Sequence, residues 1–222
     1  MDYKNAIFID FEGEGVSADR QLKIPHMIGE YVPSRTGRRY RAIFFKEEWE
    51  PLANGFLTSF NSSLQSFESY IAGLVQLAQE ENRSLVAWSS HEQHVLKEFC
   101  HADLYSQIEG ALYNLLPPAR RYCSQKKLRL AGGKRPRTLE EYYSLMAPNS
   151  PAKAELEIGA AESCRRIDKY CVAHKRWSHF SEREKRVSHN LLEYNKGDCL
   201  AAFKIAKKVS NSTSSRMITV DH

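Results

Sequence analysis

The chain has 222 residues, of which 42% are hydrophobic and 11% aromatic, and it carries a formal net charge of +5. This composition is sufficient for a sizeable core in one globular domain and excludes a wholly disordered chain. No apolar stretch approaches the roughly 20 residues of a membrane span, so we expect no membrane partner. The first residues resemble neither a secretory signal nor a transit segment, which predicts a cytoplasmic protein.

Taken in chain order, the predicted elements begin with a strand over residues 4–12 that is apolar on both faces, as in the centre of a sheet covered on both sides. Strands are also predicted over 25–32, 39–45 and 84–88, and helices over 61–81, from 90 to about 100, and over 138–146, 154–172 and 182–209. This order predicts a single α/β domain over 1–209, with a mixed sheet flanked by helices. The small polar residues from 210 onward predict a disordered tail over 210–222.

The cysteines bear on redox chemistry and on zinc. There are five, an odd number, and no two are spaced as in a CxxC motif. We therefore expect reduced thiols in or near the core, and neither a disulfide framework nor a cysteine-based zinc site.

Basic residues gather in one segment. No acidic residue lies between Glu109 and Glu140, and the rest of the chain is close to neutral. Such a segment, a basic insertion at about 117–137, favours a polyanionic partner, with a solvated loop as the alternative. A second basic stretch, the hairpin predicted over 33–41, either guides nucleic acid or is a plain exposed turn. The basic residues of the two segments are Arg35, Arg38, Arg39, Arg41, Arg120, Arg121, Lys126, Lys127, Arg129, Lys134, Arg135 and Arg137.

Two carboxylates end the first strand. Asp10 and Glu12 are two residues apart, so they project from the same face. Like charges this close repel each other, and a divalent cation such as Mg²⁺ or Mn²⁺ between them relieves the repulsion. The alternative is a strand that simply ends in solvent-exposed acids.

The last helix carries an acid inside its apolar stripe. The stripe comprises Leu191, Tyr194, Asp198, Ala202, Ile205 and Val209. A buried carboxylate is costly unless it is paired or bound to metal, and a cation shared with Asp10 would explain Asp198. Tyr194 lies one turn earlier on the same face. The alternative is a core aromatic at Tyr194 and a backbone hydrogen bond to Asp198. Gly197, costly inside a helix, either permits a close approach or is merely tolerated.

A strand ending in Asp-x-Glu and a late helix carrying Tyr-x-x-x-Asp together resemble the DEDD exonucleases of the ribonuclease H-like superfamily, in the tyrosine-bearing (DEDDy) subclass. Four segments follow, in order, the pattern of the RecB-associated, YprB-like nuclease domains. They are residues 8–13 (FIDFEG), 25–29 (PHMIG), 88–92 (WSSHE) and 192–202 (LEYNKGDCLAA). The resemblance spans residues 5 to about 208 and implies a ribonuclease H-like fold.

The resemblance also implies a site and an activity. Asp10, Glu12, Asp198 and a fourth acid would hold two Mg²⁺ or Mn²⁺ ions, and Tyr194 would orient the attacking water. Glu92 matches the place of the fourth acid, and Asp103 is the rival. The implied activity is 3′→5′ exonucleolytic hydrolysis of single-stranded DNA or RNA ends.

Three alternatives stay open: a structure-selective endonuclease with the same metal site, a non-catalytic nucleic-acid-binding module, and a scaffold whose basic loop binds an acidic protein. A protein partner in a repair, processing or defence system fits the same family. The residues expected to contact nucleic acid are Arg38, Arg39, Lys126, Lys127, Arg129, Lys134, Arg135 and Arg137.

Overall fold

A six-stranded mixed sheet forms the centre of the computed structural model, which describes residues 2–15, 22–33, 39–151 and 153–217. The sheet order is β4-β3-β2-β1-β5-β6. β2 is antiparallel to both of its neighbours, whereas the β1–β5, β5–β6 and β3–β4 pairs are parallel. The strands are β1 (Ala6–Glu12), β2 (Met27–Val32), β3 (Arg39–Phe44), β4 (Ser63–Leu64), β5 (Ser84–Ala87) and β6 (Leu112–Asn114).

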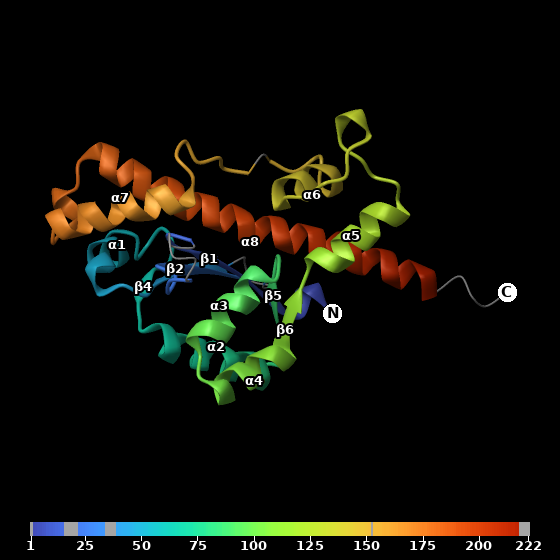
Figure 1. Ribbon diagram of the computed structural model, residues 1–222, viewed down its shortest axis with the longest axis horizontal. Helices are drawn as coiled ribbons and strands as arrows, with labels where there is room; N and C mark the ends of the chain where they lie inside the picture. Colours follow the sequence, from blue (N-terminus) through green and yellow to red (C-terminus); the bar gives the residue numbers. More distant parts are fainter. Residues whose placement is uncertain (1, 16–21, 34–38, 152, 218–222) are drawn as a thin grey trace.

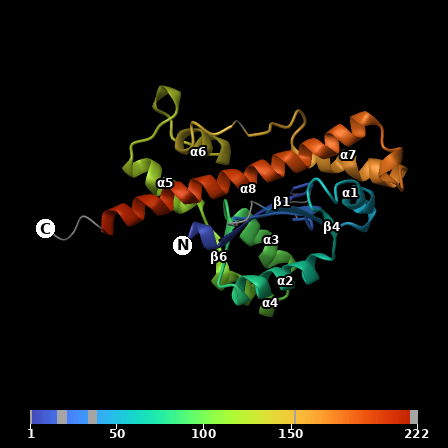
Figure 2. The same cartoon turned by 180° about the vertical axis from the view of Figure 1, so that it is seen from behind.

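Helices cover both faces of this sheet. Figure 1 shows α2, α3 and α4 below the sheet, and the long helix α8, flanked by α5, α6 and α7, above it. Figure 2 shows the same two layers from behind. The prediction of one α/β domain with a mixed sheet flanked by helices is confirmed at this level. The α-helices are α1 (Glu50–Gly55), α2 (Phe67–Glu80), α3 (His91–Phe99), α4 (Ala102–Ala111), α5 (Leu116–Gln125), α6 (Leu139–Met146), α7 (Ala160–Ala173) and α8 (Glu182–Met217).

The central strand β1 is buried on both faces, as its sequence predicted. Ile7, Ile9 and Phe11 pack in the core that lies under α2, α3 and α4. Ala6 and Phe8 project the other way, into the core formed with α5, α6 and α8. The alternation of a strand therefore places the even-numbered residues of β1, Asp10 and Glu12 included, on the α8 side of the sheet.

Helix α8 has 36 residues and runs along the whole upper layer (Figure 1). Leu191, Ala202 and Ile205 from its predicted apolar stripe are buried against the sheet and neighbouring helices. The helix continues to Met217, so the prediction of a disordered tail is wrong for residues 210–217. Polar residues with ordinary helix propensity extend an established helix at little cost. Residues 218–222 lie outside the described part of the chain.

Two helix boundaries also differ from the predicted ones. α2 begins at Phe67 because the Ser66 side chain accepts a hydrogen bond from the Ser69 amide and caps the helix, and residues 63–64 form β4 instead. α7 begins only at Ala160, after Gly159, whose φ of +49° interrupts the helical backbone. As a consequence, residues 147–151 and 153–159 have an irregular backbone, and we call this segment the strap; Lys153 of the strap reaches Asp198.

All five cysteines are buried and free, as expected for reduced thiols in a core. Among the described residues, none of the helices combines the length and the apolar character that crossing a membrane requires.

Candidate metal centre

Three of the predicted acids meet between β1 and α8. Carboxylate oxygens of Asp10, Glu12 and Asp198 all lie within 4.8 Å of one another. Glu12 and Asp198 are each only 6% exposed, whereas Asp10 is partly exposed. The strand alternation that places Asp10 and Glu12 on one face and the helical stripe that buries Asp198 therefore converge on one cluster.

The pKa values of all three carboxyl groups are raised, so ionising the cluster in the absence of a cation costs free energy. Burial, followed by the charges of Glu12, Asp198 and Glu92, raises the pKa of Asp10 well above its usual value. Burial and the charge of Asp198 raise the pKa of Glu12 to about 8. Burial also raises the pKa of Asp198, to about 6, against the opposing effect of Lys153. An oxygen-only donor set in which Asp10 and Glu12 carry no ion pair with a basic side chain in the described part of the chain suits a hard divalent cation such as Mg²⁺ or Mn²⁺.

Asn195 fixes the orientation of Asp10. Its fully buried side-chain Nδ2 donates to the backbone oxygen of Asp10 at 3.1 Å and to Asp10 Oδ2 at 2.7 Å. Its Oδ1 accepts from the Tyr40 hydroxyl at 2.7 Å. Gly29, directly opposite Asp10 in the β1–β2 register, leaves the space that this amide occupies. Sequence reasoning did not assign Asn195 a role, although a polar residue on the buried side of the last helix was a usable signal.

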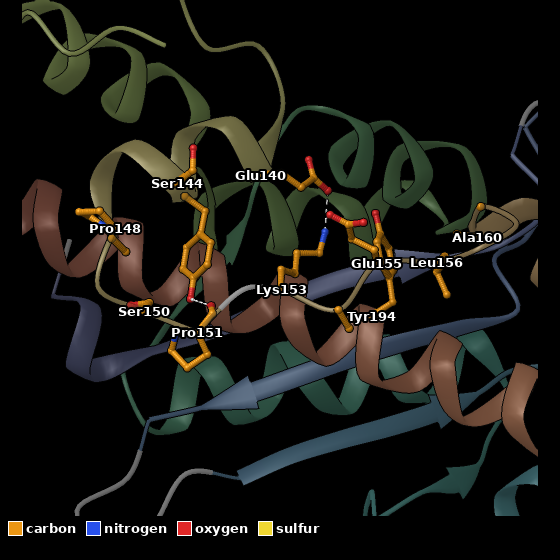
Figure 3. Close-up of a pocket in the computed structure, with 14 residues that line it drawn as sticks. Glu140, Ser144, Pro148, Ser150, Pro151, Lys153, Glu155, Leu156, Ala160 and Tyr194 are labelled. Atoms are coloured by element: carbon orange, nitrogen blue, oxygen red, sulfur yellow. Dashed lines mark hydrogen bonds and ion pairs between the residues drawn. The ribbon is translucent and has the colours of Figure 1, made fainter. Parts of the chain in front are cut away.

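A lysine from the strap completes the cluster. Lys153 Nζ forms an ion pair with Asp198 Oδ1 and a 2.6 Å ion pair with Glu140 Oε1. The same ammonium lies 4.0 Å from the centre of the Tyr194 ring. Figure 3 shows Lys153 pointing from the strap towards Glu140, above the helix that carries Tyr194. Sequence reasoning missed Lys153 because the strap has no periodicity that would place it.

Gly197 is explained by the same lysine. A Cβ atom on Gly197 would lie 2.9 Å from Lys153 Cγ, so the absence of a side chain lets the lysine stem cross α8. This is the close approach that the sequence analysis considered.

Tyr194 lines a cavity next to the cluster. Burial and the charge of Asp198 raise the pKa of its hydroxyl above the usual value, so the phenol is neutral and can donate a hydrogen bond. The cavity measures about 730 Å³ and lies between α6, the strap and α8 (Figure 3). Tyr143, Leu156 and Lys153 line it together with Tyr194.

The two candidates for the fourth acid differ in burial. Glu92, in the first turn of α3, is 5% exposed, and its charge contributes to the raised pKa of Asp10. Asp103 is exposed in the first turn of α4. Glu92 Oε2 accepts hydrogen bonds of 3.3 Å from the backbone amide and the hydroxyl of Ser89. The Ser90 side chain makes no capping hydrogen bond at the start of α3.

The basic segment lies on the surface at the α5–α6 connection. Of its eight lysine and arginine side chains, all but the half-buried Arg129 are exposed, and none forms an ion pair with an acid in the described part of the chain. Arg120, Arg129 and Arg135 line one cavity of about 230 Å³. No acidic side chain lines this cavity, which makes it suitable for an anion.

The predicted basic hairpin is only partly described. Arg35 and Arg38 lie outside the described residues, and Arg39 is exposed at the start of β3. Arg41 pairs with Glu30 at 2.7 Å and is therefore not free for nucleic acid. Tyr142 and Tyr143, which follow the basic segment, are buried in the core.

Glu14, His26 and Asp168 form a second group of metal-ligating type. Lys23 pairs with Glu14 and Lys46 pairs with Asp168, both at 2.7 Å, so the charge of this group is already compensated.

Comparison of the chain with protein-family models, with curated proteins and with solved structures finds no match. Function must therefore be argued from the geometry of the Asp10–Glu12–Asp198 cluster and its surroundings.

Proposed function

We propose that this protein is a divalent-cation-dependent nuclease that hydrolyses phosphodiester bonds, acting as a 3′→5′ exonuclease on single-stranded DNA or RNA. The observation that carries the proposal is the meeting of Asp10, Glu12 and Asp198 within 4.8 Å on the α8 side of the sheet. A mixed α/β sheet with helices on both faces is compatible with the ribonuclease H-like fold that the sequence motifs resemble. The neutral Tyr194 hydroxyl and the buried Glu92 next to this cluster agree with the DEDDy pattern.

Each residue has a distinct part in the proposed reaction. Asp10, Glu12 and Asp198 would hold Mg²⁺ or Mn²⁺, which supplies Lewis acidity and lowers the pKa of a bound water. Asn195 holds the Asp10 carboxylate in place through its 2.7 Å hydrogen bond. Tyr194, as a neutral donor, orients the attacking water or a phosphate oxygen. Glu92 accepts hydrogen bonds from water at the edge of the cluster.

The basic segment supplies the means of holding a nucleic-acid strand. Its exposed and unpaired side chains neutralise phosphates without reading sequence. The arginine-lined cavity of Arg120, Arg129 and Arg135 offers a place for one phosphate group. These features support a nucleic-acid substrate over a small phosphate ester.

The length of the products tests the proposal. Purified protein is incubated with 5′-labelled single-stranded DNA and RNA in Mg²⁺, in Mn²⁺ or in EDTA. We expect a ladder that shortens from the 3′ end and disappears in EDTA. Internal cuts with the same cation dependence would indicate the endonuclease, and salt-sensitive binding without cleavage would indicate a non-catalytic binding module.

A further inference from the structure

The ammonium group of Lys153 occupies a position inside the carboxylate cluster that is unusual for a lysine. Its side chain is only 5% exposed, although lysines are among the residues least often buried. It contacts Asp198, which belongs to the cluster, and Glu140, which comes from α6. The strap thus delivers a positive charge to the side of the cluster that faces the cavity of about 730 Å³.

Several independent contacts hold this lysine in place. Two carboxylates and the face of the Tyr194 ring surround Nζ. The aliphatic stem crosses α8 at Gly197, where a Cβ atom would lie 2.9 Å from Lys153 Cγ. Moving the ammonium out would break both ion pairs and leave the buried Asp198 carboxylate without a cation. Lys153 is therefore held in one position within the site.

We propose that Lys153 acts as the second cation of the site and binds a non-bridging oxygen of the scissile phosphate. Asp10 and Glu12 would then hold a single divalent ion. The inference rests on the nuclease function proposed above and replaces the pair of metal ions expected from the family resemblance. One divalent ion and one ammonium together balance the formal charge of the three carboxylates.

Lys153 keeps its proton throughout the proposed reaction. The oxygen of water bonds to phosphorus and that water releases a proton to solvent. The bond from phosphorus to the leaving sugar oxygen breaks, and the leaving oxygen takes a proton from solvent. The carboxylates of Asp198 and Glu140 both contact Lys153 Nζ, and two neighbouring anions favour the charged ammonium. The ammonium therefore contributes charge and hydrogen bonds to the phosphate and takes no part in proton transfer.

The number of bound metal ions tests the proposal. Mn²⁺ bound per chain is counted by electron paramagnetic resonance and isothermal titration for the unchanged protein and for Lys153→Met. We expect one ion for the unchanged protein and two for the variant, because loss of the ammonium frees Asp198 for a second ion. Gly197→Ala, which keeps the lysine but displaces its stem, is expected to shift the count in the same direction.

The matched control is Lys204→Met, which removes another α8-side ammonium that bonds the Tyr143 hydroxyl and contacts no carboxylate of the cluster. It should bind one ion, like the unchanged protein. Circular dichroism melting establishes that each variant is folded. Equal numbers of ions in the unchanged protein and in Lys153→Met would overturn the role of Lys153 alone. No bound Mn²⁺ in either protein would overturn the proposed function as well.

Discussion

Gly29 and Asn195 fit against each other so closely that a Cβ atom on Gly29 would lie 1.7 Å from Asn195 Oδ1. Gly29 is paired with Asp10 in the β1–β2 register, and Asn195 donates to the Asp10 carboxylate. Because Gly29 in β2 has no side chain, the Asn195 amide of α8 can lie against Asp10 in β1. The orientation of the first carboxylate depends on this three-element contact.

Gly29→Ala should accordingly impair the site more than the fold. The added methyl group displaces Asn195, so the Asp10 carboxylate loses its 2.7 Å donor and metal affinity falls by about tenfold or more, the equivalent of one lost hydrogen bond to a charged group. Isothermal titration with Mn²⁺ measures this loss. The control is Gly73→Ala in α2, where a Cβ meets nothing within 4 Å and the helix gains about 1 kcal/mol of stability. Unchanged affinity in Gly29→Ala would show that Asn195 does not position Asp10.

Stability should fall with rising pH when no divalent cation is present. The pKa of Glu12 is raised from 4.5 to about 8 and that of Asp198 from 3.8 to about 6, in each case chiefly by burial. Between about pH 4 and pH 8 the folded state therefore binds more protons than the unfolded state, and the free energy of unfolding decreases by a few kcal/mol.

Mg²⁺ should offset this loss because it binds the ionised carboxylates. We expect the increase in Tm caused by Mg²⁺ to be larger near pH 8 than near pH 5. Differential scanning calorimetry with Mg²⁺ and with EDTA measures this difference. The Glu12→Gln variant should reduce the difference between the Tm increases at pH 8 and pH 5. An effect of Mg²⁺ that does not depend on pH would contradict the assignment of the cluster as its binding site.

The position of the fourth acid predicts opposite behaviour for two conservative variants. Glu92→Gln removes a buried charge near Asp10 and should lower cleavage by about 10²-fold, the usual effect of losing a residue that assists proton transfer or water orientation. Asp103→Asn alters an exposed side chain and should leave cleavage unchanged. Rates measured under single-turnover conditions distinguish them. Loss of activity in Asp103→Asn alone would reverse the assignment.

The basic segment should govern affinity for nucleic acid. Replacing Arg120, Arg129 and Arg135 with glutamine removes the charges that line the anion cavity. The slope of log affinity against log salt concentration for a single strand should become shallower by about 0.7, the value for the one phosphate group that this cavity would hold. Fluorescence anisotropy across a salt series measures the slope.

A control with the same change in charge uses Lys169, Lys175 and Arg176, which are exposed in and just after α7. Glutamine at these positions should leave the slope unchanged. If both triple variants reduce the slope equally, the contribution of the basic segment is only that of net charge.

Much of the site was predictable because two simple periodicities determine it. The alternation of β1 placed Asp10 and Glu12 on one face, and the helical stripe of α8 placed Asp198 among buried residues. Each argument needs only one regular element and its burial. The meeting of the elements follows because α8 packs on the face of β1 that carries the acids.

The rest depends on contacts that no local pattern encodes. Lys153 belongs to the irregular strap, and only the tertiary packing of the strap on α8 brings it to Asp198. The role of Asn195 could be predicted only by knowing that Gly29 lies opposite Asp10, and this depends on the register of the β1–β2 pair. The tail was mispredicted for a related reason, since polar composition alone does not show whether an adjoining helix continues.

The central claim is that the Asp10–Glu12–Asp198 cluster hydrolyses phosphodiester bonds with a divalent cation. The most direct measurement compares cleavage of one 5′-labelled single strand in Mn²⁺ by the unchanged protein and by folded Asp10→Asn. The account predicts progressive shortening from the 3′ end by the unchanged protein and a loss of at least about 10²-fold in the variant, as expected when a metal ligand of a catalytic site is removed. Equal cleavage by both proteins, or none by either at saturating Mn²⁺, would contradict it.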